Sequence, residues 1–184
     1  MKVVVLYESI YGNTHAVADC ISDGLRAAGA DVDVVHVSDC EHGAVLEADL
    51  VVVGGPTHVR AMPRPSTRKA AADRATTRHQ VSEPTARQDG LREWFDTMVD
   101  AHGIAAAAFD TRQDAARVLT GQASLGIRSR LRARGFRMIA PPESFLVDKQ
   151  PQLLAGETDR AVQWGRTIAG LGLSRSEAMP RRGA

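Results

Sequence analysis

Cysteine and aromatic residues are scarce in this chain of 184 residues. Its two cysteines, Cys20 and Cys40, form no CxxC pair, and no histidine spacing suits zinc, which argues against a zinc-binding module and a disulfide-stapled fold. No apolar run approaches the roughly 18 residues that a membrane-spanning helix needs. The short apolar run at residues 3–7 follows only Lys2 and precedes no small-residue cleavage pattern, so we expect a cytoplasmic protein.

An excess of either charge is also missing over the whole chain. The 23 basic and 22 acidic residues give a net charge of +1, which argues against a generally basic nucleic-acid binder. The two signs are unevenly distributed, however. Residues 1–58 hold two basic and nine acidic residues, a net charge of −7, which leaves +8 for the rest of the chain.

The composition that remains, 43% hydrophobic and 24% charged, is typical of globular proteins, and the length suits one domain. Buried β-branched runs such as residues 2–7 alternate with amphipathic segments such as residues 15–28. This alternation predicts an α/β fold with a parallel sheet and right-handed crossovers. We expect strands at 2–7, 31–37, 49–53 and 104–109, a fifth strand broken by Pro141-Pro142 between 136 and 147, and helices at 15–28, 91–101, 122–134 and 157–169.

We expect the domain to cover residues 1–172 and residues 173–184 to form a flexible tail. Within the domain, residues 59–90 hold seven basic and three acidic residues, three prolines and almost no large apolar residue. We interpret this segment as a long mobile loop with a helical turn at 67–73. It is either a solubilising loop, or a lid, or a docking surface for an anionic partner or a nicotinamide phosphate.

The loop between the first strand and the first helix carries the chemistry. Ser9, Asn13 and Thr14 supply short hydroxyl and amide groups, and Gly12 lets the backbone curl without a Cβ clash. The helix start adds unpaired N–H groups and the positive end of the helix dipole. The pattern predicts a phosphate site with neutral donors, and an ordinary N-cap turn is the alternative. The P-loop motif GxxxxGK[ST] and the Rossmann motif GxGxxG are both absent.

Two motifs in this order resemble the flavodoxin-like family. Ser9-x-Tyr11-Gly12-Asn13-Thr14 is similar to the loop that holds the FMN phosphate in that family. Residues 49–58, DLVVVGGPTH, are similar to its third strand and to the loop beside the isoalloxazine ring. The resemblance covers residues 1–58 closely and 91–170 loosely. It implies a flavodoxin-like three-layer α/β sandwich, with a parallel five-stranded sheet of order 2-1-3-4-5, and bound FMN.

The resemblance also implies roles for particular residues. The phosphate would be held by Ser9, Tyr11, Gly12, Asn13 and Thr14, and the flavin ring would be bordered by Pro56, Thr57 and His58. By position alone, the loop after the fourth strand adds Phe109, Asp110, Thr111 and Arg112.

Two of these residues are open to two interpretations. His58 is a candidate to stack on the ring or to donate a proton to it, or else is a surface histidine. Arg112 is a candidate neighbour of the pyrimidine oxygens, or else is a solvated loop arginine. We expect no metal ligands.

The function implied by the resemblance is electron transfer through FMN. The partner would be a redox protein, steered by the acidic surface of residues 1–58, or NAD(P)H. Aromatic residues, at 4%, are too few for a firm ring sandwich, because Trp94 and Trp164 lie on predicted core faces. An open ring face favours the alternative of an NAD(P)H-dependent quinone or small-molecule reductase. A flavodoxin-fold protoporphyrinogen oxidase and a non-redox module that binds another phosphate ligand are further alternatives. We expect neither nucleic acid nor membrane as a partner, and the oligomeric state stays open.

Overall fold

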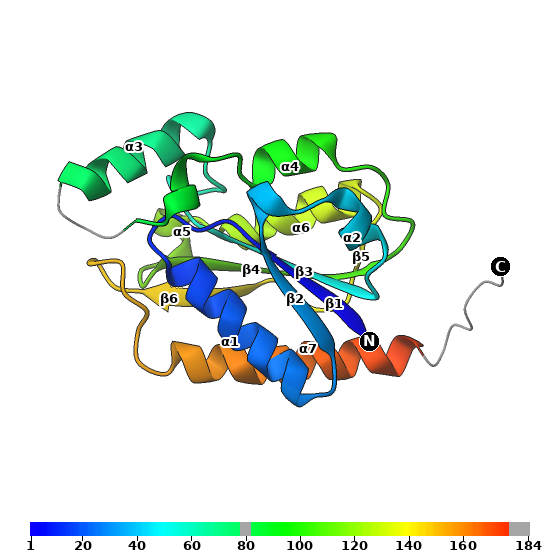
Figure 1. Cartoon of the computed structure of the whole chain (residues 1–184). Coiled ribbons are helices and arrows are strands. Elements are labelled where there is room, and N and C mark those ends of the chain that lie inside the picture. The colour runs from blue at the N-terminus through cyan, green and yellow to red at the C-terminus, as the bar shows by residue number, and fades with distance from the viewer. Residues whose placement is uncertain (78–81, 177–184) are drawn as a thin grey trace.

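The computed structural model describes residues 1–77 and 82–176, which form a central sheet covered on both faces by helices (Figure 1). The strands are β1 (Lys2–Tyr7), β2 (Asp31–His36), β3 (Leu50–Pro56), β4 (Ala105–Gln113), β5 (Arg137–Met138) and β6 (Glu143–Val147). The helices are α1 (Asn13–Ala27), α2 (His42–Leu46), α3 (Pro65–Thr77), α4 (Leu91–Thr97), α5 (Arg117–Thr120), α6 (Ala123–Ala133) and α7 (Glu157–Ser176), with short 3-10 helices at Val37–Asp39 and Pro84–Arg87. Among the described residues, no helix combines the length and apolarity needed to cross a membrane.

All strand pairs in the sheet are parallel, and the order β2-β1-β3-β4-β5 confirms the predicted order. The fifth position is shared by two short strands, because both β5 and β6 pair with β4. Pro141-Pro142 separates them, as expected from the missing N–H of proline. The sequence therefore predicted the break in this strand correctly.

Strand β4 extends further than the sequence indicated. Residues 109–112, predicted as a loop, lie inside the strand and pair with β3 on one side and β6 on the other. The alanine run before them is weak strand material, so its pattern gave no reason to continue the strand. Pairing on both edges, which local propensity does not reveal, holds these residues extended.

The sheet buries apolar side chains on both faces, in the alternation that a β-strand imposes. Val3 and Val5 pack with α1 and α7 on one face, whereas Val4 and Leu6 pack with α4 and α6 on the other. Both tryptophans belong to these cores, as predicted. Trp94 of α4 is buried in one core, and Trp164 of α7 packs against the core on the other face of the sheet.

Helices α1 and α7 approach closely through two glycines. A Cβ at Gly24 would lie 2.0 Å from the carbonyl oxygen of Val162, and a Cβ at Gly165 would lie 2.2 Å from that of Ile21. Neither position has room for a methyl group, so the small residues fix the distance between the two helices.

The described part of segment 59–90 is more ordered than predicted. It contains the 13-residue helix α3, where a single helical turn was expected, and the 3-10 helix Pro84–Arg87. Four side chains of α3 are buried: Arg68, Ala71, Ala72 and Ala75. Small alanines and one arginine do not resemble a core-facing stripe, which is why the pattern failed to predict this helix.

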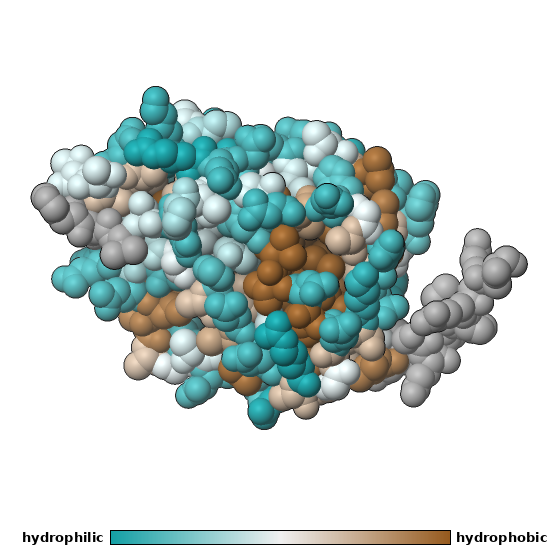
Figure 2. Space-filling model, in the orientation of Figure 1, coloured by the Kyte–Doolittle hydropathy of each residue, from teal (hydrophilic) through white to brown (hydrophobic). Residues whose placement is uncertain are grey.

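At the other end of the chain, α7 continues to Ser176, so the first residues of the predicted tail are helical, and residues 177–184 lie outside the described part of the chain. Figure 2 shows an apolar area over the middle of β2, enclosed by hydrophilic side chains. This strand is an edge of the sheet, and exposed Asp31 and Asp33 discourage pairing with another chain there.

Candidate cofactor site

The carboxyl ends of β1, β3 and β4 meet beside the start of α1, where open parallel sheets bind ligands (Figure 1). A cavity of about 580 Å³ opens at this place. It is lined by Ile10, Tyr11, Asn13, Thr14, Pro56, Thr57, His58, Val59, Arg60, Arg74, Thr111, Arg112, Gln113, Ala115, Leu119, Thr120, Val147, Lys149 and Pro151.

The loop after β1 is shaped by Gly12, whose φ of 87° lies in the left-handed region that glycine tolerates best. The Ser9 hydroxyl accepts a hydrogen bond of 3.1 Å from the Gly12 N–H, which closes the turn. Helix α1 then begins at Asn13, and its first N–H groups have no carbonyl partner within the helix. Its positive end therefore faces the cavity and favours an anion.

Three predicted phosphate residues line the cavity, and two of them, Asn13 and Thr14, connect α1 to other parts of the chain. The Asn13 amide donates to the carbonyl oxygen of Pro151 at 2.6 Å, and the hydroxyls of Thr14 and Thr111 lie 2.7 Å apart. Tyr11 also lines the cavity, and its hydroxyl donates to the carbonyl oxygen of Ala71 at 3.3 Å. Ser9 and Gly12 shape the loop but are not among the lining residues.

The loop after β3 contributes all three of its predicted residues, Pro56, Thr57 and His58. The Thr57 hydroxyl donates to Asp110 Oδ2 at 2.6 Å and accepts from the Ala123 N–H at 2.8 Å, so it braces the loop against α6. Burial, with a smaller contribution from the positive charge of Arg74, lowers the pKa of His58. A neutral imidazole is therefore favoured at this edge of the cavity.

Just beyond His58 the backbone is strained. Val59 and Arg60 have φ angles of 49° and 68°, and such angles are rare for side chains with a Cβ, above all for a β-branched one. A β-bridge joins Arg60 to Gly121, where a Cβ would lie 2.1 Å from the Arg60 carbonyl oxygen. The two loops at this end of the cavity are thus held together through the backbone.

Two residues predicted beside the flavin ring are not brought to the cavity by the structure. Phe109 is fully buried against Phe145 and Trp164, and Asp110 is fully buried below the loop; neither lines the cavity. Burial raises the pKa of Asp110. Both lie inside β4, so the third loop at the site is residues 114–121 instead.

The other two residues of that predicted group, Thr111 and Arg112, do line the cavity. Arg112 is neither solvated nor free: it is 8% exposed, and its Nη1 donates to the carbonyl oxygens of Gln113 and Ala115 at 3.2 and 2.9 Å. It therefore holds the third loop in shape and adds a buried positive charge to the cavity wall.

Sequence reasoning missed the remaining lining residues, which are Ile10, Val59, Arg60, Arg74, Gln113, Ala115, Leu119, Thr120, Val147, Lys149 and Pro151. The sequence could have predicted Arg60 and Arg74 at the cavity, because the basic segment that contains them begins directly after His58. Lys149 and Pro151 follow β6, and only the topology brings them beside α1.

The acidic residues of the N-terminal third do not surround the cavity. No lining residue is an aspartate or glutamate, whereas four are arginine or lysine. Most acidic side chains of residues 1–58 lie elsewhere, on β2, α1 and the connecting loops, and steering of a redox partner by this acidic surface stays a prediction. Among the described residues there is also no cluster of three or more side chains suited to a metal ion.

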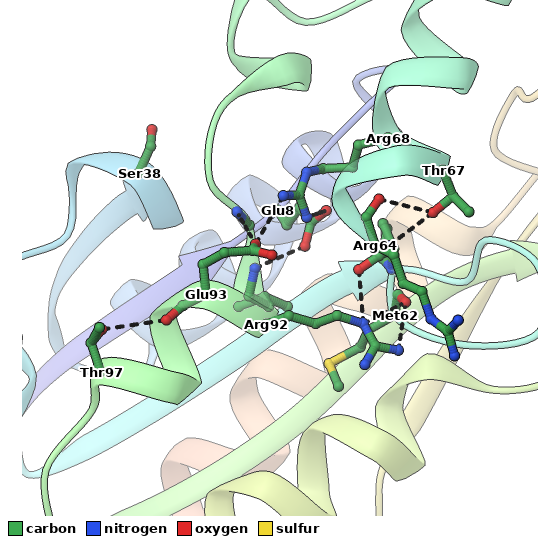
Figure 3. A network of polar contacts seen from close by, with 12 residues as sticks. Glu8, Ser38, Met62, Arg64, Thr67, Arg68, Arg92, Glu93 and Thr97 are labelled. Atoms are coloured by element: carbon green, nitrogen blue, oxygen red, sulfur yellow. Dashed lines mark hydrogen bonds and ion pairs between the residues drawn. The ribbon is translucent and has the colours of Figure 1, made fainter.

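A buried ion network connects helix α3 to the phosphate loop (Figure 3). Arg68 Nη1 lies 3.5 Å from Glu8 Oε1, and its Nη2 lies 2.8 Å from Glu93 Oε2. Glu8 also accepts from the Leu91 N–H at 2.9 Å, and Glu93 from the Gly90 N–H at 2.9 Å. Burial raises the pKa of Glu8, whereas hydrogen bonds and Arg68 hold that of Glu93 below its ordinary value.

A second contact joins the end of the same segment to this loop. The Glu83 N–H donates to the carbonyl oxygen of Ile10 at 2.9 Å, and its carboxylate lies 3.0 Å from His15 Nδ1 on α1. Ile10, Ala71 and Ala86 form a small apolar cluster between them. The described part of segment 59–90 therefore forms a wall of the site.

Comparisons with known proteins agree with this geometry. Residues 5–88 match the family model described as Flavodoxin. An NAD(P)H dehydrogenase (quinone) of Cupriavidus metallidurans is 38% identical over 76 residues, covering 30% of this chain and 38% of that protein. A flavodoxin of Aquifex aeolicus is 37% identical over 59 residues, covering 32% of each chain.

A solved structure has the same fold over nearly the whole length. A flavodoxin from the domain Archaea superposes with a TM-score of 0.64 at 21% identity, covering 94% of this chain and 99% of that one. In contrast, the chain spans less than two fifths of the length of the two curated relatives named above.

Proposed function

We propose that this chain, which has the flavodoxin fold, is a flavodoxin-like protein that binds FMN in the cavity and transfers electrons through it. One observation carries the proposal: a single cavity joins an anion-binding helix start at Thr14 to two ring-side loops at His58 and Leu119. An elongated ligand with a phosphate at one end and a planar ring at the other fits this arrangement of donors and walls.

The phosphate end is served by neutral groups. The first N–H groups of α1 would bind the phosphate, with Asn13 and Thr14 adding side-chain donors after small rotations from their present partners. No cation is needed there, because the helix dipole and several N–H donors act together on the anion.

The ring end is bordered by side chains that differ in character. Val59 and Leu119 present aliphatic groups, His58 a neutral imidazole, and Arg112 a fixed positive charge. When bound, FMN supplies the reversible uptake of one or two electrons. Arg112 would favour negative charge on the ring through its position, and His58 would donate or accept a hydrogen bond there.

A flavin titration tests the proposal. We expect the purified protein to be yellow, to release FMN on denaturation, and to bind added FMN more tightly than riboflavin by at least about tenfold, because only FMN carries the phosphate. A colourless protein that takes up neither flavin contradicts the proposal and favours a non-redox phosphate-binding module on the same fold.

A reductase is the second candidate function. Among the described residues, Tyr11 and His58 are the only aromatic ones that line the cavity, which leaves space over a ring for a substrate, and a relative is named NAD(P)H dehydrogenase (quinone). Anaerobic addition of NADH or NADPH to the FMN-loaded protein separates the two functions. Direct bleaching favours the reductase, whereas no bleaching without a partner protein favours the electron carrier.

A further inference from the structure

Positive charge without a partner surrounds the mouth of the cavity. Arg60, Arg74 and Lys149 are exposed and line the cavity, and Arg117 is exposed on α5 beside it. Among the described residues, no ion pair includes any of these four. Exposed Arg87, in contrast, is paired with Asp73 at 2.6 Å, whereas exposed Arg64, Arg132, Arg137 and Arg166 have no ion pair with a described residue either, so the position of the four cations around the cavity is what distinguishes them.

Apolar side chains lie between these cations. Val59, Val118 and Leu119 are 73%, 79% and 63% exposed, more than any other large hydrophobic residue described. The β-bridge between Arg60 and Gly121 brings their two loops side by side, so the three residues belong to one surface. We call this surface the mouth patch, and it comprises Val59, Arg60, Arg74, Arg117, Val118, Leu119 and Lys149.

Bound FMN would leave Arg60 and Arg117 of the mouth patch without a counter-charge. Its phosphate would lie at the start of α1, at the opposite end of the cavity from Arg60 and Arg117. Arg60 and Arg117 therefore stay available to a second molecule, whereas Lys149, two residues from the Pro151 carbonyl that binds Asn13, and Arg74, three residues along α3 from the Ala71 carbonyl that binds Tyr11, lie nearer the phosphate end. An apolar centre with a charged rim of one sign is the composition of a transient protein interface, and such a rim attracts a partner of opposite charge.

We propose that the mouth patch docks an acidic one-electron carrier protein, and this inference rests on the proposed binding of FMN. Carboxylates of the partner pair with Arg60 and Arg117, while an apolar spot on the partner covers Val59, Val118 and Leu119. In each encounter the metal centre of the partner would be oxidised by one electron and bound FMN would be reduced by one electron. Two encounters, with protons taken from water, complete a two-electron reduction.

The positive charge of the mouth patch determines which kind of partner it can bind. A partner with a basic docking face meets like charge and is repelled, which costs both affinity and association rate. The charged rim also predicts weaker binding at high salt, because exposed charges are screened beyond about 8 Å at physiological ionic strength.

The experiment uses an acidic plant-type [2Fe–2S] ferredoxin and basic cytochrome c as probes. Binding of each to the purified full-length protein is measured by calorimetry at low and high salt. The variants are Arg117→Glu and the double variant Arg60→Glu/Arg117→Glu. The matched control is Arg166→Glu, an exposed arginine on α7 that packs beside Gly24, far along α1 from the cavity.

We expect ferredoxin to bind the wild type and the control alike, each reversed charge to weaken its binding by about tenfold, and cytochrome c to bind only the reversed variants. Equal ferredoxin binding by all variants, or stronger cytochrome c binding to the wild type, overturns the proposal. A flavin titration run in parallel tests the proposed function separately, because Arg117 does not line the cavity and its reversal should leave FMN affinity unchanged.

A small dinucleotide is the other source of negative charge. If Arg60→Glu raises the KM for NADPH while ferredoxin binding is the same as in the wild type, the cations serve NADPH and the docking proposal is wrong.

Discussion

Arg68 of α3 forms an ion pair with Glu8, the last residue before the phosphate loop, and both side chains are almost completely excluded from water, at 4% and 2% exposed. Sixty residues of chain separate them, and the nitrogen–oxygen distance is 3.5 Å. The pair ties a helix that lies outside the sheet to the strand from which the phosphate loop emerges.

Removing Arg68 should destabilise the protein strongly. Arg68→Met leaves the Glu8 carboxylate buried without its cation, so we expect a loss of about 3–5 kcal/mol in the free energy of unfolding, measured by urea denaturation. Arg87→Met is the control: it breaks an exposed pair with Asp73 and should cost less than about 1 kcal/mol. Equal losses in the two variants would show that the buried pair has no special role.

The raised pKa of Glu8 predicts how stability depends on pH. Because the folded protein holds this proton more tightly than the unfolded chain, stability from this group is present below the ordinary value of 4.5 and is lost as pH rises through the raised pKa. The wild type should therefore lose stability relative to Glu8→Gln as pH increases from 4 to 7. Urea denaturation of both proteins at several pH values measures this, and a wild type that gains stability with pH relative to the variant contradicts it.

Val59→Gly should relieve backbone strain. The Val59 side chain is mostly exposed, so its loss removes little packing, and glycine adopts a φ of 49° without a Cβ clash. We expect a gain of about 1 kcal/mol in the free energy of unfolding after the entropic cost of glycine. The control Val99→Gly, at an exposed valine without positive φ, should lose stability. A loss of the same size in Val59→Gly would rule out the strain.

The double variant Asn13→Ala/Thr14→Ala should weaken FMN binding by about 1–3 kcal/mol, because two donors to an anion are lost, and leave riboflavin binding nearly unchanged. Fluorescence titration of the apoprotein with each flavin measures both affinities. Ser22→Ala is the control on the same helix, since its hydroxyl donates to the Ala18 carbonyl oxygen away from the cavity. Unchanged FMN affinity in the double variant would mean that the phosphate lies elsewhere.

Gly121→Ala should weaken the binding of FMN and riboflavin alike, unlike the Asn13→Ala/Thr14→Ala variant. A Cβ there collides with the Arg60 backbone and separates the two ring-side loops, so affinity for FMN and riboflavin should fall by a similar factor of about tenfold or more. Gly103→Ala carries the same positive-φ strain, at 88°, but meets no atom within 4 Å, and should change neither affinity. If both glycine variants behave alike, backbone strain alone explains the effect.

The first half of the fold, including the loop and helix start beside the cavity, could be predicted from the sequence, because its determinants are local. A β-branched run, a polar loop with Gly12 and an amphipathic helix follow one another within 30 residues, and each has its own periodicity. The break at Pro141-Pro142 was local too, since proline lacks the N–H that a strand needs.

The ring end was not readable, because its determinants are long-range. Phe109 stays in a strand only because β6 pairs beside it, and Arg68 is buried only because Glu8 and Glu93 meet it from distant parts of the chain. An arginine in a basic, proline-containing segment has the pattern of a solvated side chain, and nothing within a short window distinguishes the two.

The glycine contact between α1 and α7 has a consequence for shortened forms of this protein. No cavity-lining residue belongs to α7, so the last helix would count as dispensable in any inventory of binding residues. Yet the phosphate loop ends where α1 begins, and the close contact through Gly24 and Gly165 fixes the position of α1 against α7. Truncation within α7 should therefore weaken the proposed binding of FMN although every described residue that lines the cavity is still present.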